Sequence, residues 1–421
     1  MHFYSALAAA LMTAKLSLAD SPGQMTNFDL GPEYTSVDAN GSLAPSSGFL
    51  ALPTPNPHDT EVKLNLIAWA HSTIGLHRGC VPSSAMELWG LDTFGPLLAE
   101  GYAIVATDYV GLGTNYTSHK YLSLVDHAND IYYSVRAVRK VFPDLFNVKW
   151  MSIGHSQGGG AVWKLSEHPL VQYSRSGYVG TVAIAPAVNA LDLATTAYDI
   201  ILPGISSDEL FAKAETPLLL MGIKAASPDY QMPWAAQALK ERIQYASAAQ
   251  SCLFATAGLT FDLRDEQFIA PGAATPMNDD VLKAWTRQHA AAQGALASMP
   301  LLVIQGLNDS AIPPECTRRA YEKASHANRV RLEEYPRRDH FNVLEASRPT
   351  WLKFVRDRFS NKTTDWEMSN HVIHSEDLTT ITSSLDVERN TVSDLSEDVI
   401  EAWPLFQRLS QRVEVSEHHL R

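Results

Sequence analysis

The sequence predicts an α/β fold in which helices cover both faces of a mostly parallel central sheet. Short apolar runs, typical of buried strands, alternate along the chain with segments of helical periodicity. Such alternation is typical of parallel strands joined by helices that return across the sheet. The strands are expected at residues 62–69, 101–107, 150–153, 180–185, 300–304 and 330–335. The helices are expected at residues 89–100, 125–142, 157–165 and 349–359.

Residues 187–298 interrupt this alternation. Helix-like segments follow one another there and are joined by Pro-rich turns. They span residues 206–214, 234–249 and 279–294. We interpret residues 187–298 as a mainly helical cap, inserted after the sixth strand of a core made of residues 20–186 and 299–360. The alternative is that the α/β repeat continues with long helices.

The N-terminus has the features of a secretory signal. Residues 3–14 are apolar, and Ser17-Leu-Ala19 resembles a small-residue cleavage site, so residues 1–19 are expected to be a signal peptide. Because Lys15 interrupts the apolar run and no Lys or Arg precedes it, an N-terminal helix is the alternative. The sequons that would carry glycans on a secreted protein begin at Asn40, Asn115, Asn308 and Asn361.

Two other stretches stand apart in composition from the core. Pro53-Thr-Pro-Asn-Pro57 lies in a region rich in Pro, Ser, Gly and Asn and is expected to form a stiff linker or surface arm. Residues 361–421 are acidic and rich in Ser and Thr. We expect this tail to be partly disordered or to pack a helix on the core, and residues 399–413 are the helical candidate.

The three cysteines allow one disulfide and one remaining thiol in an oxidising compartment. We favour a bond between Cys80 and Cys252, although the sequence leaves the two pairings with Cys316 open. Three buried thiols, behaving as small apolar side chains, are the alternative.

Composition argues against several classes of partner. The net charge of −13 gives no electrostatic reason to expect nucleic acid or an anionic membrane surface. No run approaches the roughly 18 apolar residues that a membrane span requires. Gly111-Leu-Gly113 lacks the third glycine and the helix of a dinucleotide fingerprint, so Asp108 is expected to brace this loop instead. We expect neither a cofactor nor a metal.

The strongest chemical motif is Gly154-His-Ser-Gln-Gly158. It follows an apolar run and precedes a helical pattern, which is the strand–turn–helix context of a nucleophile elbow. Ser156 would be the nucleophile, exposed on a strained turn. The amide of Gln157 would point to where an oxyanion forms at the helix N-terminus. A chance match to this loose motif is the alternative, and the surrounding pattern argues against it.

Two other loops supply the partners that such a serine needs. Asp309 follows the strand at 300–304, at the edge of the sheet where catalytic groups gather. His340 lies in the loop after the strand at 330–335. The chain order of serine, aspartate and histidine is the one expected of an α/β-hydrolase fold. Asp339 is the rival acid, but neighbours in sequence rarely face each other well enough for this hydrogen bond.

The remaining oxyanion donor is expected in the turn His71-Ser72-Thr73, directly after the strand at 62–69. We assign the amide of Thr73 to this role, with Ser72 beside it. Ser72 stands where such turns usually have glycine. An ordinary turn is the alternative, and His71 is expected to be structural.

With these residues in place, the chain resembles the fungal secretory lipase family of α/β hydrolases. The resemblance covers roughly residues 25–360 and rests on several motifs together. These are Ala68-Trp-Ala-His-Ser-Thr73 with Cys80-Val-Pro-Ser83, Gly101-Tyr-Ala-Ile-Val-Ala-Thr-Asp-Tyr-Val-Gly-Leu-Gly113, Gly154-His-Ser-Gln-Gly-Gly159, and the Asp309 and His340 loops. It implies a secreted serine hydrolase with a helical cap that acts on carboxylic esters without a cofactor. Transient contact of the cap with a lipid interface is also implied.

Three narrower functions remain open from the sequence. The substrate could be a lipid, or a secondary metabolite from which an acyl group is removed, since similar fungal enzymes do both. A peptidase on the same scaffold is a further alternative. It would need an acidic subsite for the peptide amine, and the sequence shows no identifiable one.

Overall fold

The computed structural model describes most of the chain between residues 26 and 374. The described ranges are 26–29, 34–53, 63–84, 91–201, 209–360 and 372–374. The predicted signal peptide, most of the Pro-rich arm, the sequon at Asn361 and the helix predicted at 399–413 lie outside them.

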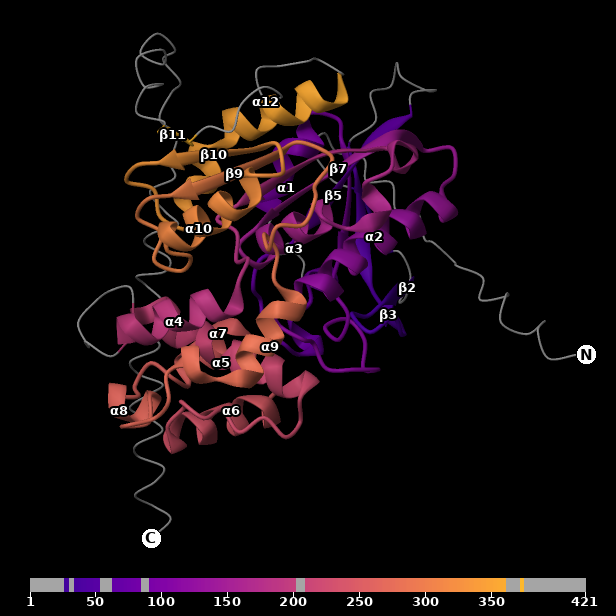
Figure 1. Cartoon of the computed structure of the whole chain (residues 1–421). Coiled ribbons are helices and arrows are strands. Elements are labelled where there is room, and N and C mark those ends of the chain that lie inside the picture. Colours follow the sequence, from indigo (N-terminus) through magenta and orange to yellow (C-terminus); the bar gives the residue numbers. More distant parts are fainter. Residues whose placement is uncertain are drawn as a thin grey trace, which may run out of the picture. The chain divides into compact units, whose positions relative to one another are not determined.

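The described residues form a nine-stranded sheet, as Figure 1 shows. Its order is β1-β4-β6-β5-β7-β8-β9-β10-β11. All neighbours from β6 to β11 are parallel, whereas β4 pairs antiparallel with β6 and β1 pairs antiparallel with β4. This order confirms the mostly parallel sheet. The strands are β1 (Thr26–Asp29), β4 (Gly48–Leu52), β5 (Leu64–Ala70), β6 (Ala103–Thr107), β7 (Phe146–His155), β8 (Tyr178–Ile184), β9 (Leu301–Gly306), β10 (Val330–Tyr335) and β11 (Val372–His374).

The sheet has additional strands toward both of its edges that the sequence does not predict. Four strands lie in the region rich in Pro, Ser and Gly. They are β1 and β4 of the large sheet and the separate hairpin of β2 (Tyr34–Val37) and β3 (Leu43–Ser46). The edge strand β1 and the hairpin strands tolerate such residues, so their sequences have no buried-strand pattern. Strand β4 differs, because it is a buried apolar run between β1 and β6 that the sequence analysis missed. At the other edge, the three residues of β11 pair with β10, so part of the acidic tail extends the core sheet.

Helices cover both faces of the sheet because strand residues alternate between two apolar clusters. In β5, Leu66 and Ala68 face one cluster, while Ile67 and Trp69 face the other. The first cluster includes residues of α2 (Leu124–Val141), α3 (Gln157–Ser166) and α10 (Pro314–Ser325). The second includes residues of α1 (Leu91–Ala99), α11 (Asn342–Ala346) and α12 (Arg348–Phe359).

The described residues between β8 and β9 form helices that gather beside the sheet in Figure 1. These are α4 (Ala190–Ile201), α5 (Glu209–Ala226), α6 (Gln237–Ala248), α7 (Leu253–Gly258), α8 (Asp265–Phe268) and α9 (Asp280–His289), here called the helical insertion. Helix α4 was not predicted. The end predicted for α5 at residue 214 is wrong, because the helix continues through Pro217. None of the helices described is long and apolar enough to cross a membrane.

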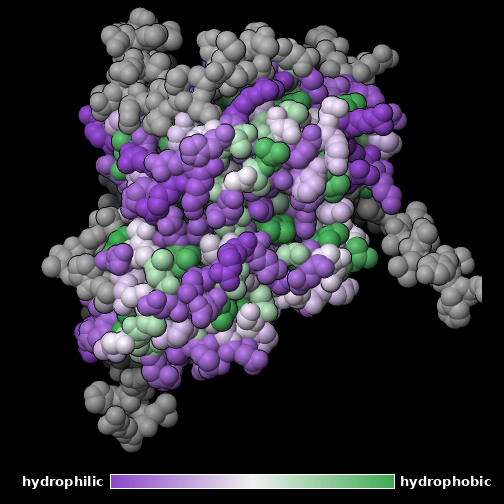
Figure 2. Space-filling model, in the orientation of Figure 1, coloured by the Kyte–Doolittle hydropathy of each residue, from purple (hydrophilic) through white to green (hydrophobic). Residues whose placement is uncertain are grey.

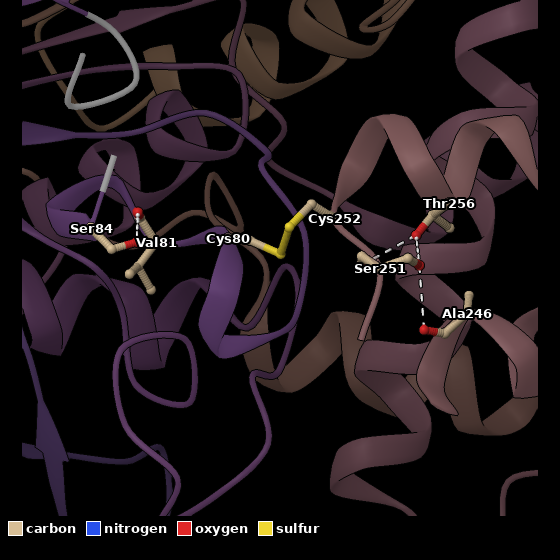
Figure 3. The surroundings of a disulfide bond; sticks show 7 residues. All are labelled: Cys80, Val81, Ser84, Ala246, Ser251, Cys252 and Thr256. Carbon is tan, nitrogen blue, oxygen red and sulfur yellow. Dashed lines mark hydrogen bonds between the residues drawn. A yellow bond between two sulfur atoms is a disulfide. The ribbon is translucent and has the colours of Figure 1, made fainter. Parts of the chain in front are cut away.

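A disulfide joins the helical insertion to the loop after β5. Cys80 is bonded to Cys252, as predicted, and Figure 3 shows the bond linking two separate segments. Beside it, the amide of Leu253 donates to the carbonyl of Ile74 over 2.9 Å. Cys316 is free and buried. The disulfide therefore fixes the start of α7 close to the turn that carries Thr73.

Removing this bond is expected to destabilise the protein. The bond closes a loop of 172 residues, so replacing Cys80 and Cys252 with serine should lower the free energy of unfolding by about 2–5 kcal/mol. Thermal and urea denaturation would measure this loss. Cys316→Ala is the control, because it removes a thiol without opening a cross-link. A double variant no less stable than this control would contradict the prediction.

Candidate active site

Ser156 lies at the tight turn between β7 and α3, with φ 57° and ψ −120°. A non-glycine residue rarely adopts this conformation, which is strained. The turn is possible because two glycines pack closely around it. A Cβ on Gly158 would lie 2.0 Å from the carbonyl oxygen of Ala70, and one on Gly154 would lie 2.4 Å from that of Gly158. Close packing of β5, β7 and α3 thus holds Ser156 in place.

Asp309 and His340 are hydrogen-bonded to each other. The Nδ1–H of His340 donates to Oδ2 of Asp309 over 2.8 Å, and both side chains are buried. The Oδ1 of Asp309 accepts the amides of Ala311 and Ile312 at 3.0 and 2.8 Å. Gln305 donates to Oδ2 over 3.1 Å. Because the carboxylate is held from several sides, it fixes the histidine tautomer that leaves Nε2 free to accept a proton.

The rival acid Asp339 is occupied elsewhere. Its Oδ1 accepts the amides of Phe341 and Asn342 over 3.0 and 2.8 Å, and its Oδ2 accepts the side-chain amide of Asn342. These bonds satisfy amides at the start of α11. Asp309, rather than Asp339, is therefore hydrogen-bonded to His340.

The pKa of His340 is raised above its ordinary value of 6.5 as the net result of opposing effects. Burial lowers the pKa, since it disfavours the charged ring. The charge and hydrogen bond of Asp309 raise it, and the nearby carboxyl groups of Glu215 and Asp339 add to this effect. The site is therefore built to stabilise a protonated His340.

His155, the residue before Ser156, connects the elbow to the histidine loop. Its Nε2 bonds the carbonyl oxygen of His340 over 2.8 Å, and the two rings lie 4.5 Å apart. A carbonyl only accepts, so Nε2 carries the proton and Nδ1 accepts from the hydroxyl of Ser72 at 2.8 Å. Burial lowers the pKa of His155 well below its ordinary value, which keeps this ring neutral. Ser72 therefore binds the elbow through its side chain.

Within the described residues, the hydroxyl of Ser156 has no hydrogen-bond partner. The bond from His155 brings the His340 loop beside the serine, but the bond between Ser156 and His340 itself is not formed. Such bonds are often open in free enzymes and form when substrate binds.

The two predicted oxyanion donors are both unoccupied. In the described part of the chain, the backbone amides of Thr73 and Gln157 have no acceptor. The hydroxyl of Thr73 is hydrogen-bonded to that of Tyr121 at 2.8 Å, which fixes the turn after β5. The amide of Gln157 lies at the N-terminus of α3, where the helix dipole favours negative charge.

Two buried histidines hold the side chain of Gln157. Its Nε2 donates to Nε2 of His119 over 3.3 Å and to Nε2 of His127 over 3.1 Å. Both rings must be neutral to accept. Burial accordingly lowers the pKa of His119 to about 3 and that of His127 well below its ordinary value. These contacts occupy the side-chain amide of Gln157, whereas its backbone amide has no acceptor among the described residues.

His71 and Asp108 are both buried, and Asp108 bonds loops other than the Gly111-Leu-Gly113 loop that it was expected to brace. Asp108 accepts the amide and hydroxyl of Ser83 at 3.0 and 2.6 Å and the hydroxyl of Ser47 at 2.6 Å. His71 is buried and packs against Tyr109 with ring centres 4.3 Å apart. Both residues brace the loops beneath the site.

A narrow pocket opens next to Asp309. The cavity has a volume of about 470 Å³, which includes space open to solvent. The centre of a water molecule can occupy about 40 Å³ of this volume. Helices α4 and α5 form one wall, through residues such as Leu193, Ile200 and Leu219. Ser310 and Ala311 of the Asp309 loop also line it. The pocket therefore offers a mostly apolar space beside the proposed base.

Sequence reasoning missed three parts of this site. His155 lies inside the elbow motif, but only the fold brings it to His340. His119 and His127 are separated from Gln157 by at least 30 residues and give no local signal. Glu215 could have been noticed, because it is an acid three residues before the apolar run of Leu218 to Met221.

Many solved structures share the fold, and three of them serve as examples. A putative hydrolase from Legionella pneumophila is 17% identical with a TM-score of 0.65, and the alignment covers 82% of this chain and 91% of that one. The rice cell wall degrading esterase LipA from Xanthomonas oryzae is 19% identical with a TM-score of 0.60, covering 79% and 89%. Lipase A from Candida antarctica is 14% identical with a TM-score of 0.60, covering 81% and 78%. At such low identity, these similarities show the fold alone.

The family comparison is more specific. The model of the secretory lipase family matches residues 90–366, well over half of the chain. The matched region contains the elbow, the helical insertion, and the Asp309 and His340 loops. A search of the curated proteins finds no match. The chain belongs to the secretory lipase family and is a carboxylic ester hydrolase with an α/β-hydrolase fold.

Proposed function

We propose that the chain cleaves carboxylic esters through a triad of Ser156, Asp309 and His340 and a covalent acyl-enzyme. The observation that carries this proposal is the 2.8 Å bond from His340 to Asp309, in a loop that His155 ties to the elbow. This geometry supports a base beside a strained, unpartnered serine, which is the arrangement that nucleophilic acyl transfer needs.

The proposed reaction has two halves. His340 removes the proton of Ser156 as the serine oxygen attacks the ester carbonyl, and Asp309 stabilises the imidazolium that forms. The amides of Thr73 and Gln157 bind the oxyanion, and each such donor typically lowers the barrier by about 3 kcal/mol. His340 then protonates the leaving alkoxide. Water repeats the sequence on the acyl-enzyme and releases the acid.

We further propose that residues 187–298 act as a cap over the site. Helices α4 and α5 line the pocket beside Asp309, and the Cys80–Cys252 bond holds the insertion to the core. The mostly apolar wall suits an acyl chain or another apolar arm of an ester. A lipid and an acylated secondary metabolite both fit this description, and hydrolysis of esters of graded length would distinguish them.

Contact with a lipid interface is part of the same proposal. Tyr245 and Phe254, on helices α6 and α7, are 63% and 61% exposed, which supports transient contact of the insertion with lipid. Figure 2 shows hydrophilic residues over most of the visible face, with smaller apolar areas among them. Activity that does not rise when a soluble ester passes its aggregation limit would count against such contact.

The ester series is also the main test of the triad. Hydrolysis of p-nitrophenyl esters from acetate to palmitate should be lost by about a thousandfold or more in Ser156→Ala, because no other group supplies the nucleophile. Ser247→Ala, at an exposed position of α6, is the matched control. Maximal rates with long chains would support a lipase, and rates confined to short chains would support a small-acyl esterase. Ester turnover that survives in Ser156→Ala would overturn the proposed triad.

The pH profile tests the role of Asp309. His340 acts as a base only when neutral, so kcat/KM should rise with pH through a midpoint above 6.5, the direction of its pKa shift. Asp309→Asn removes the charge that raises this pKa, so the midpoint should move to lower pH. The variant should also lose about 10⁴-fold in kcat, since the tautomer is no longer held. An unchanged midpoint in Asp309→Asn would contradict this assignment.

We propose that residues 1–19 direct secretion, in line with the family to which the chain belongs. Asn40 and Asn115 are exposed and are the proposed glycan acceptors. Expression in a eukaryotic host should give protein in the medium that begins near Asp20 and loses mass on enzymatic deglycosylation. Retention of residues 1–19 in the secreted protein would refute the signal peptide.

A further inference from the structure

Glu215 is an acidic side chain inside the mostly apolar pocket beside Asp309. It lies on α5, next to the buried residues Ala214 and Thr216, and its own side chain remains partly exposed because it lines the pocket. Phe211, one turn earlier on the same helix, has its ring 6.4 Å from that of His340. Glu215 is therefore positioned where substrate would pass between the helical insertion and the proposed triad.

The carboxyl group of Glu215 has no hydrogen-bond donor among the described residues. Its pKa is raised to about 7, mainly by burial, as the net result of burial, of nearby His340, which lowers the pKa, and of nearby Asp309, which raises it. Placing an unpaired carboxyl group in such surroundings costs free energy that an apolar side chain of similar size would not. Folding alone therefore gives no reason for an acid at this position.

The proposed mechanism assigns no proton transfer to this acid, although its charge adds to raising the pKa of His340. Asp309 already bonds Nδ1 of His340, and the proposed mechanism assigns each proton transfer to His340. What Glu215 offers to the pocket is a hydrogen-bond acceptor with no internal partner. In a pocket with apolar walls, a single polar group of this kind determines which ligands bind.

We propose that Glu215 is a specificity-determining residue that accepts a hydrogen bond from a hydroxyl group on the ester arm occupying this pocket. This inference rests on the proposed function, since it takes Ser156 and His340 as the reacting centre. The preferred substrate is then an ester whose apolar arm carries a hydroxyl group, rather than a plain aliphatic ester.

A neutral hydroxyl group suits the site better than an ammonium group. His340 must become positively charged during the reaction, and a cation bound at Glu215 would oppose that charge. A hydroxyl group satisfies the acceptor without this penalty. The same reasoning argues against a peptide amine at this position. Glu215 is nevertheless an acid of the kind that a peptidase would need, and the sequence did not reveal it.

The test compares hydroxylated and plain esters of equal length. One series contains methyl octanoate and its monohydroxylated analogues, and the other contains octanoate esters of octanol and of octanediols. Hydrolysis is followed by pH-stat titration. At a pH above the pKa of about 7, where Glu215 is charged, kcat/KM of the native enzyme should favour a hydroxylated member of at least one series by about tenfold or more, the effect of a hydrogen bond to a charged group.

Glu215→Leu should abolish this preference, because it keeps the side-chain bulk and removes the acceptor. Glu215→Gln should retain part of it, since the amide oxygen still accepts. Glu241→Leu, at an exposed position of α6, is the matched control and should keep the native ratio. The ratio of hydroxylated to plain substrate is the decisive readout, because a purely structural defect lowers both rates together.

Three results would overturn the inference. The first is a native enzyme without preference for hydroxylated esters in either series. The second is a Glu215→Leu variant with the native ratio. The third is a higher kcat/KM for the octanoate ester of an amino-octanol, assayed beside the octanediol esters, than for its hydroxyl analogue. If plain esters are still hydrolysed through Ser156 in these cases, the proposed triad stands while the role of Glu215 fails. Loss of all activity in Ser156→Ala, with an unchanged ratio in Glu215→Leu, separates the two claims.

Discussion

The site depends on the hydrogen bond between the ring of His155 and the carbonyl oxygen of His340. It joins the end of β7, where Ser156 is held in a strained turn, to the loop after β10. Because burial keeps His155 neutral, one ring nitrogen always donates to this carbonyl and the other always accepts from Ser72. The turn after β5, the elbow and the histidine loop are therefore connected through one ring. Loops from distant parts of the sequence need such a connection to hold a base beside a nucleophile.

The helical insertion adds substrate recognition to this core. The disulfide and the bond from Leu253 to Ile74 attach the insertion next to the turn that carries Thr73. On its other side, α4 and α5 form the wall of the pocket. The insertion thus contacts the site at two places. This arrangement explains how a single acid on α5, Glu215, can influence the charge of His340 although it lies more than 120 residues away in sequence.

The sequence predicts the positions of the parallel strands along the chain and the loops that carry the proposed triad, because both have local signatures. Buried strands are apolar runs, and the elbow has glycines at fixed offsets from Ser156. Ser156, Asp309 and His340 remain proposals for catalysis, although the bond between the last two agrees with that assignment. The edge strands β1 and β11 have no such signature, since edge strands do not need apolar residues on both faces. Strand β4 does have an apolar run, but the run lies in a region rich in Pro, Ser and Gly and was missed.

Contacts across the fold could not be read from the sequence at all. Which polar side chains bond each other depends on how the loops meet. The pairs concerned are His155 with His340, Gln157 with His119 and His127, and Ser72 with His155. The end of helix α5 could not be predicted for a different reason. Pro217 suggests the end of a helix, yet packing of the surrounding apolar residues maintains the helix through it.

A crystal structure of the enzyme inactivated by an alkyl p-nitrophenyl phosphonate would test the central claim most directly. The account predicts phosphorus bonded to the oxygen of Ser156 and the phosphoryl oxygen about 3 Å from the amides of Thr73 and Gln157. His340 should remain bonded to Asp309, with its Nε2 directed at the phosphonate. An adduct on another residue, or a phosphoryl oxygen held by groups other than these two amides, would contradict it.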